Sequence, residues 1–424
     1  MTAPLVSIFF ALLLFGLPIF AALALAVTAT LYFFGAINPV VVPMRMFSGM
    51  NNFSLMSIPF FILAAELMRI GGLSDRLIGL AKSIIGWVPG GLAAAAVLAC
   101  LFFGSISGSS PATVIAIGTI MYPALVDAGY SKRFSIGLLT TAGTLGPIVP
   151  PSIALIIYGS VTGSSVGRLF AAGLLPAILV AVLLISYCIA ISIMRRYPRE
   201  GTPSLKEMGA AFKHAAWGLG LPVLLLGGIY SGVFTPTESA AVACFYGWIV
   251  GALIYRNISI KDTLNILKSS GLVAGVLLLI TAGASAFSWI LASTGAPTQL
   301  AAEVLSTTDS PIWVMLLFNL IMLVAGCFLD SASAIIVLAP LMQPIAAQVG
   351  VDAIHFGVIT LVNLSIGMLT PPVGLNLFVA MRISNMSLYE VFISCLPFVL
   401  LMLVALLAVT YVPWFSLALP GLIY

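Results

Sequence analysis

The sequence predicts an all-α protein that crosses a membrane many times, and its composition and length lead to that prediction. Of 424 residues, 62% are apolar and only 7% are charged, whereas a soluble domain is usually about 25% charged. A spanning helix needs about 20 residues, so roughly ten to twelve segments fit this length. The composition excludes an ordinary cytosolic enzyme, and 16 basic residues are too few for a nucleic-acid-binding stripe. We therefore expect contact with a lipid bilayer and none with nucleic acid.

Seven apolar runs are long enough to predict uninterrupted helices. The first run lacks the basic start of a cleaved signal peptide, so we expect it to remain as a span. The runs cover residues 5–34, 53–70, 168–194, 214–233, 238–255, 271–294 and 390–414. The five cysteines fall within apolar stretches and have no metal-like spacing, so we interpret them as small core residues.

Two further stretches have the pattern of a hairpin with a polar tip. In the first, the arm 92–103 leads to a Gly- and Ser-rich segment at 104–111, and a second arm ends near residue 127. An arm of 12 residues reaches about 18 Å, well short of a hydrocarbon core of roughly 30 Å. This length favours a re-entrant hairpin. Residues 312–348 repeat the pattern around a tip at 330–333.

Two other apolar stretches are interrupted by a pair of prolines. Residues 134–163 are predicted to form one helix broken at 146–151, and residues 355–383 one helix broken at 367–372. Each proline removes a backbone N–H donor and disfavours helix in the residue before it. We therefore expect two broken helices, each of which crosses the membrane once.

The basic residues support this topology and set its orientation. With both hairpins re-entrant, 14 basic residues share one face and only Arg45 and Arg168 lie on the other. The positive-inside rule makes the larger group cytoplasmic. A first hairpin that spanned the membrane fully would separate Lys82 from Lys132 and weaken the sorting. The cytoplasmic group is Arg69, Arg76, Lys82, Lys132, Arg133, Arg195, Arg196, Arg199, Lys206, Lys213, Arg256, Lys261, Lys268 and Arg382.

The two interrupted regions match each other at a constant register shift of 221 residues. The first hairpin opens to the cytoplasm and the second to the outside, so the match indicates an inverted repeat. Such repeats with interrupted helices are typical of secondary transporters, whose site lies at the midplane between the repeats. The matched pairs are Ser109 and Asp330, Ser110 and Ser331, Pro123 and Pro344, Gly129 and Gly350, Gly146 and Gly367, Pro150 and Pro371, and Pro151 and Pro372.

The repeat divides the chain into five expected segments. Residues 1–88 form the N-terminal scaffold, and 89–165 the first hairpin and broken helix. Residues 166–310 supply further scaffold helices and cytoplasmic connections. Residues 311–384 hold the second hairpin and broken helix, and 385–424 a C-terminal helix.

Irregular backbone at membrane depth must be buried in protein or line a wet cavity, so we expect the tips and breaks to converge. Carbonyl and hydroxyl oxygens suit a small hard cation, and helix N-termini suit a carboxylate. One site could thus bind an anionic solute together with a coupling sodium ion, with glycines allowing the close approach. The candidate substrate-binding residues are Ser109, Ser110, Thr113, Ser152, Asp330, Ser331, Ser333 and Asn376.

Each of these candidates also has a structural interpretation. Serine and threonine in membrane helices often bond to their own turn or to a neighbouring helix. Asp330 is the strongest functional candidate because it is an acid inside the membrane, yet it could equally cap the second hairpin arm. Outside the repeats, Thr235 and Glu238 have the spacing of a capping box. Glu66 lies near the interface or pairs with Arg69.

The chain resembles the large membrane subunit of tripartite ATP-independent periplasmic (TRAP) transporters. Four motifs carry the resemblance: GSISGSSPAT at 104–113, GPIVPPS at 146–152, FTPTE at 234–238 and TPPVGLNLF at 370–378. The resemblance implies an inner-membrane, sodium-coupled importer without enzymatic activity, in which the hairpins and broken helices move like an elevator against a static scaffold. It implies two partners, a small membrane subunit and a soluble periplasmic binding protein.

The resemblance also implies a substrate class and two sodium sites, with sodium as coupling ion and no cofactor. Family substrates are organic acids such as C4-dicarboxylates or sialic acids, and the hydroxyl-rich tips slightly favour sialic acid. The first sodium site would use Ser105, Ser107, Gly108, Gly146, Val149 and Pro151. The second would use Gly326, Asp330, Gly367, Thr370 and Val373.

Two alternatives remain at this point. A stand-alone sodium–dicarboxylate symporter would have a related architecture but need no binding protein. An intramembrane hydrolase could use Ser107 as nucleophile, although no histidine is evidently placed to activate it. The absence of a Walker motif in the sequence argues against ATP hydrolysis by this chain.

Overall fold

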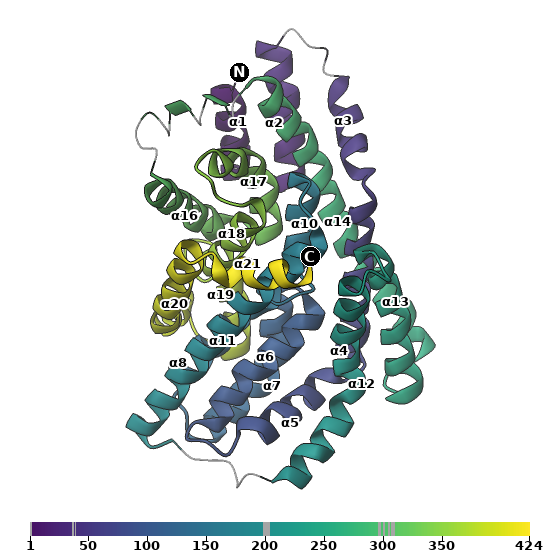
Figure 1. The fold of residues 1–424 in the computed structure, drawn as a ribbon, viewed down its shortest axis with the longest axis vertical. Coiled ribbons are helices and arrows are strands. Elements are labelled where there is room, and N and C mark those ends of the chain that lie inside the picture. Colours follow the sequence, from purple (N-terminus) through teal and green to yellow (C-terminus); the bar gives the residue numbers. More distant parts are fainter. Residues whose placement is uncertain are drawn as a thin grey trace.

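A computed structural model describes residues 2–35, 38, 40–197, 204–295, 298–299, 302–303, 306 and 310–424. All regular structure in these residues is helical (Figure 1). In this part of the chain nine helices are long and apolar enough to span a membrane, or ten if a bent pair over 132–162 counts as one. The all-α polytopic fold class is therefore confirmed.

The N-terminal scaffold differs from the prediction at its first helix. The expected single span over residues 5–34 is wrong, because the chain turns at Phe15–Pro18 and forms two helices that pack against each other. Gly16 has φ of 80°, which favours glycine, and Pro18 lacks the N–H that a continuous helix would need. The elements are α1 (Thr2–Leu14), α2 (Ile19–Phe34), α3 (Val41–Met50), η1 (Phe53–Met56), α4 (Ser57–Ile70) and α5 (Leu73–Ile85).

The first hairpin and broken helix follow the predicted order. The first arm is longer than expected: it runs for 17 residues and ends before Gly108, which gives about 25 Å. The broken helix bends by 42° between its halves. The elements are α6 (Gly91–Ser107), α7 (Ser110–Asp127), α8 (Lys132–Ala142), α9 (Leu145–Ile148) and α10 (Ile153–Thr162).

The second hairpin and broken helix repeat this order, with arms of 18 residues each. Arms of that length could cross a membrane, so length alone does not distinguish a re-entrant hairpin. The arrangement of the arms indicates re-entrant hairpins, because the tips of both hairpins meet inside the molecule, as described below. The elements are α16 (Pro311–Phe328), α17 (Ser331–Gln348), α18 (Ala353–Gly367) and α19 (Leu375–Ser384). Figure 1 places α16 and α17 in the upper half of the view and α6 and α7 in the lower half.

The remaining helices surround these two units. The long α14 packs against α2, α3, α4 and α17, while α11 packs against α6, α18 and α20. The predicted capping box of Thr235 and Glu238 opens α13, and Glu66 pairs with Arg69 as expected. The elements are α11 (Val166–Arg195), α12 (Leu205–Tyr230), α13 (Pro236–Ile249), the π-helical turn η2 (Val250–Ile254), α14 (Ile260–Ser293), α20 (Leu388–Tyr411) and α21 (Trp414–Ile423).

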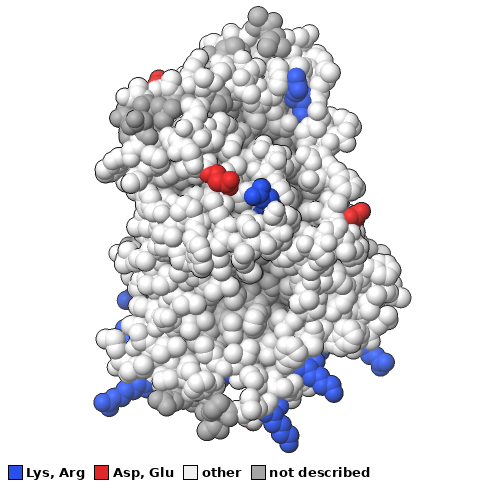
Figure 2. All heavy atoms as spheres, in the orientation of Figure 1, with Lys and Arg blue, Asp and Glu red and all other residues white. Residues whose placement is uncertain are grey.

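Charge is concentrated at one end of the molecule. Figure 2 shows basic side chains gathered at the lower end of the view, below a broad uncharged band. In Figure 1 this end holds α5, the end of α11 and the start of α12. These segments carry Arg76, Lys82, Arg195 and Lys206, four members of the expected cytoplasmic group.

Candidate functional site

The two hairpin tips and the two helix breaks meet around a cavity of about 210 Å³. Each interruption contributes to its wall, so the predicted convergence is confirmed. Scaffold helix α14 adds a single residue, Leu277. The tips supply Gly108, Ser109, Ser110, Pro111, Asp330, Ser331 and Ala332, and the breaks supply Pro147, Ile153, Ala154, Met368 and Leu375.

The tip of the first hairpin is a cluster of hydroxyl groups. Gly108 turns the chain with φ of 58°, which brings Ser107 Oγ to 2.9 Å from the Oγ1 of Thr113. Thr113 Oγ1 also lies 2.8 Å from the carbonyl oxygen of Ser109. Ser105 donates its hydroxyl to Phe102 O in its own helix. A hydroxyl that donates in this way keeps lone pairs for a cation.

The tip of the second hairpin is organised by Asp330. Its carboxylate accepts hydrogen bonds from the backbone N–H of Ala332 at 3.0 Å and of Ser333 at 3.3 Å. It also accepts the Ser333 hydroxyl. The predicted helix cap is therefore confirmed, and Asp330 lines the cavity at the same time. A carboxylate has about four lone-pair sites, so capping leaves it capacity for a further ligand.

Glycines let each hairpin touch its break at the level of the backbone. A Cβ at Gly146 would lie 2.6 Å from Ser109 O, and one at Gly367 would lie 2.5 Å from the Cα of Gly326. A Cβ at Gly108 would lie 3.1 Å from Pro151 O. These distances confirm the predicted close approach. They also bring Gly108, Gly146 and Pro151 of the expected first sodium site together.

The two breaks differ in how their helix ends are satisfied. In the first, Ser152 caps α10 by accepting the N–H of Leu155 at 3.3 Å, and it lies outside the lining of the cavity. In the second, the matched Val373 is 38% exposed. The N–H groups of Val373 and Gly374 instead donate to Cys327 O at 3.2 and 3.1 Å.

Other residues of the expected sites lie close by. Val149 is buried where α9 ends, and its N–H donates to Leu145 O. Thr370 donates its hydroxyl to Ile366 O at 3.3 Å. Both therefore lie in the breaks, and their assignment to sodium sites stays a prediction.

A hydrogen bond between the repeats holds the second break to the first hairpin. Asn376 Nδ2 donates to the Oγ of Ser110 at 2.6 Å, across 266 residues of sequence. Its Oδ1 is buried and has no hydrogen-bond partner in the described part of the chain. The sequence suggested that Asn376 faces the cavity. In the structure Asn376 is buried and is hydrogen-bonded to Ser110, which itself lines the cavity.

Sequence reasoning missed most of the apolar wall and one supporting polar network. Nothing in an apolar run distinguishes the residues that line the cavity, which include Ile153, Ala154, Leu277, Met368 and Leu375. Behind the second hairpin, Asn363 Nδ2 donates to Asn319 Oδ1 at 2.9 Å. Asn319 Nδ2 in turn donates to the Oγ1 of Thr410 at 3.1 Å. Amides within predicted spans were the available signal for this network.

Comparisons with known proteins agree with this architecture. A family model described as "Tripartite ATP-independent periplasmic transporter, DctM component" matches residues 6–415. The C4-dicarboxylate TRAP transporter large permease protein DctM of Rhodobacter capsulatus is 39% identical, with 97% of each chain covered. The sialic acid TRAP transporter large permease protein SiaM of Vibrio cholerae is 35% identical, with 97% of this chain and 96% of the relative covered.

A solved structure supports the fold independently of sequence. The Alcanivorax borkumensis YdaH transporter, whose topology is described as unusual, matches with a TM-score of 0.63. The match covers 95% of this chain and 98% of that chain at 14% identity, so it speaks for the fold alone. The relatives are named as permeases rather than enzymes. The chain is a multi-pass inner-membrane protein that belongs to the family of large permease subunits of TRAP transporters.

Proposed function

We propose that this chain imports a small organic acid by sodium symport, as the large membrane subunit of a TRAP transporter. The observation that carries the proposal is the cavity lined by both tips and both breaks, with Asp330 in its wall. An acid inside a membrane protein is a functional candidate by default. Here it lies among backbone and hydroxyl oxygens, the ligands that suit a hard cation.

The anionic nature of the substrate is supported by the helix ends around the cavity. Ser110, Ser331, Ile153 and Leu375 begin α7, α17, α10 and α19, and all four residues line the wall. A helix N-terminus carries about half a positive charge, which favours a carboxylate. Four such ends offset the negative charge of Asp330.

The size of the cavity favours a C4-dicarboxylate over a sialic acid. Its volume of about 210 Å³ is below the roughly 300–1,000 Å³ of pockets for drug-sized ligands. A four-carbon diacid fits this space better than a nine-carbon sugar acid. We therefore prefer the smaller substrate to the sialic acid that the hydroxyl-rich tips slightly favoured, and a relative named for C4-dicarboxylates supports this choice.

The proposed partners are a small membrane subunit and a soluble periplasmic binding protein. The family description as tripartite and periplasmic, and relatives named as large permeases, support both. The binding protein would deliver the acid to the outer face. The small subunit would extend the static scaffold.

An elevator movement is supported by the unequal covering of two symmetry-related grooves, one between α10 and α17 and the other between α7 and α19. Asn52, just before η1, donates through Nδ2 to the Oγ of Ser160 on α10 at 3.0 Å. The α10–α17 side of the interrupted unit thus lies against the scaffold. The register shift of 221 residues relates this side to a groove between α7 and α19, which is lined by those two helices alone. If the interrupted unit moved so that the α7–α19 groove became covered and the α10–α17 groove became open, the cavity would face the other side of the membrane.

Uptake by the reconstituted transporter tests the proposal. The chain would be placed in proteoliposomes with its small subunit, and labelled succinate added with the binding protein and an inward sodium gradient. We expect accumulation only when sodium and the binding protein are both present. Uptake that persists when sodium and the binding protein are both removed would contradict the proposal. Uptake that needs sodium but not the binding protein would favour a stand-alone symporter.

A further inference from the structure

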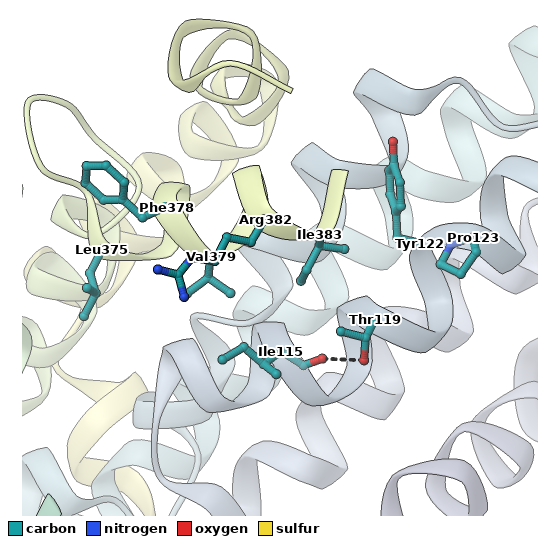
Figure 3. Close-up of a pocket in the computed structure, with 9 residues that line it drawn as sticks. All are labelled: Ile115, Thr119, Tyr122, Pro123, Leu375, Phe378, Val379, Arg382 and Ile383. Atoms are coloured by element: carbon teal, nitrogen blue, oxygen red, sulfur yellow. Dashed lines mark hydrogen bonds between the residues drawn. The ribbon is translucent and has the colours of Figure 1, made fainter. Parts of the chain in front are cut away.

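A groove of about 770 Å³ runs between the second arm of the first hairpin, α7, and the second half of the other broken helix, α19 (Figure 3). It is continuous with the candidate site, because Leu375 lines both the groove and the cavity. From there it extends along α19 to Ile383 and along α7 to Pro123. An anion that leaves the cavity on this side would pass through it.

Arg382 is the one charged residue in the wall of this groove. Its side chain is exposed, and the described part of the chain offers it no salt bridge. In Figure 3 its guanidinium extends toward the Leu375 end, and the hydroxyl of Tyr122 points away from it. Thr119 already donates its hydroxyl to Ile115 O at 2.8 Å. Arg382 is therefore the group in the groove with the most unused hydrogen-bonding capacity.

The groove that the register shift relates to it, between α10 and α17, carries no such charge. The shift of 221 residues relates Ile115 to Ile336 and Arg382 to Val161. Ile336 and Val161 line a second groove, of about 480 Å³, whose remaining walls include α14 and the segment around Asn52. The covered groove is thus neutral, and the open groove is cationic.

The open groove leads to the basic end of the molecule. Both α7 and α19 pack against α8, which begins with Lys132 and Arg133 of the expected cytoplasmic group. An isolated cation between apolar walls focuses its field along a groove and raises the local concentration of anions. A guanidinium also matches the geometry of a carboxylate.

We propose that this groove is the inner path of the organic acid and that Arg382 is a transient anion-binding site along it. The proposal rests on the proposed function, because it takes the substrate to be a carboxylate. Arg382 would capture the acid as it leaves the cavity. It would equally rebind acid from the inside of the membrane, which provides the means to test it.

The test uses the complete transporter in proteoliposomes preloaded with succinate. Binding protein added only outside restricts uptake to molecules with their periplasmic face outward. Internal succinate that occupies the inward-open site slows uptake, and the internal concentration that halves the rate measures the affinity of that side. We compare wild type, R382Q, R382K and K213Q, the last as a control for an exposed lysine on α12 outside the groove.

We expect R382Q to raise the half-inhibiting internal concentration about tenfold, R382K to raise it less, and K213Q to leave it unchanged. Internal salt should raise this concentration in wild type and not in R382Q, since screening acts on the charge that the variant lacks. The external concentration for half-maximal uptake should stay the same in all variants. An unchanged internal affinity in R382Q, or an equal change on both sides, would overturn the proposal.

Varying the lipid composition distinguishes binding of the organic acid in the groove from binding of a phospholipid headgroup. If the groove held a phospholipid headgroup, R382Q would differ from wild type in vesicles that contain phosphatidylglycerol but not in pure phosphatidylcholine, and that result would also overturn the proposal. Failure of wild type to take up succinate with sodium would refute the proposed function and, with it, the path that rests on that function. Uptake by wild type with an unchanged internal affinity in R382Q would overturn the path alone, so the two failures are distinguishable.

Discussion

The two interrupted regions have the same backbone plan and different chemistry. Both cross a glycine of the hairpin against a glycine of the break, and in both the second arm begins at the cavity. The first break is buried and capped by Ser152, while the second is partly exposed at Val373 and carries no side-chain cap. The charge in the wall of the cavity, Asp330, and the charge in the adjoining groove, Arg382, both belong to the second repeat. The two repeats therefore share their backbone geometry but differ in their charges and in how their breaks are capped.

Removing the carboxylate of the second tip should have the largest effect. Removing one partner of a fully buried charge pair costs about 3–5 kcal/mol. Asp330 is half-buried, so we take the lower end of this range, which is about 100-fold in binding. We expect Asp330→Ala to abolish sodium-driven uptake in proteoliposomes, and Ser109→Ala, at the matched position, to retain most of it.

Asp330→Asn separates charge from capping. Asparagine caps a helix as well as aspartate does, so this variant should insert and assemble normally and still fail to transport. Normal transport by Asp330→Asn would reduce the residue to its structural role.

Filling the glycine crossings tests whether the two geometries are equally tight. Gly146→Ala and Gly367→Ala place a Cβ 2.6 Å and 2.5 Å from the nearest backbone atom. Overpacking of this kind costs about 1–3 kcal/mol, so both variants should lower the Tm of the purified protein. Gly227→Ala is the control, since no heavy atom lies within 4 Å of its Cβ. If only one of the two variants kept the Tm of wild type, the two crossings would not be equivalent.

Exchanging the caps of the two breaks should have a smaller effect. Ser152→Val gives the first break the residue found in the second and leaves the N–H of Leu155 without its acceptor. The loss of an N-cap costs about 1 kcal/mol, and Ser152→Thr should restore it. The reverse change, Val373→Ser, should leave the Tm nearly unchanged because the second break is partly exposed. A Ser152→Val protein as stable as wild type would contradict the assigned cap.

The bond between the repeats should give the smallest effect. Side-chain hydrogen bonds inside membrane proteins average about 0.6 kcal/mol in double-mutant cycles. We expect this coupling between Asn376→Ala and Ser110→Ala in thermal unfolding. Additive effects of the two substitutions would mean that the 2.6 Å contact contributes nothing to stability.

The sequence was sufficient to predict the fold class and the four interruptions, because glycine, proline and serine within apolar runs leave a visible mark. It was insufficient at Gly16 and Pro18, where the flanking residues are as apolar as a continuous span. It also placed the end of the first arm at Gly104 instead of Gly108, since glycine can pack inside a helix as well as end one.

The candidate site was predictable in its polar part only. The tips and breaks carry serines, an aspartate and proline pairs that a reader of the sequence can find. Leu277 and Met368 have no chemical signature, and the contact of Asn376 with Ser110 joins residues that only the fold brings together. The sodium ligands and the roles of the hydroxyls stay predictions.

In the proposed mechanism, one cavity binds an organic acid together with sodium, with Asp330 as the charged ligand. Thermal unfolding of the purified chain with succinate tests it most directly, because two ligands that favour each other's binding stabilise the protein together. We predict that succinate raises the Tm of wild type in sodium chloride but not in potassium chloride, and that Asp330→Asn loses this increase while it retains its fold. An equal increase in both salts, or an undiminished increase in Asp330→Asn, would contradict the account.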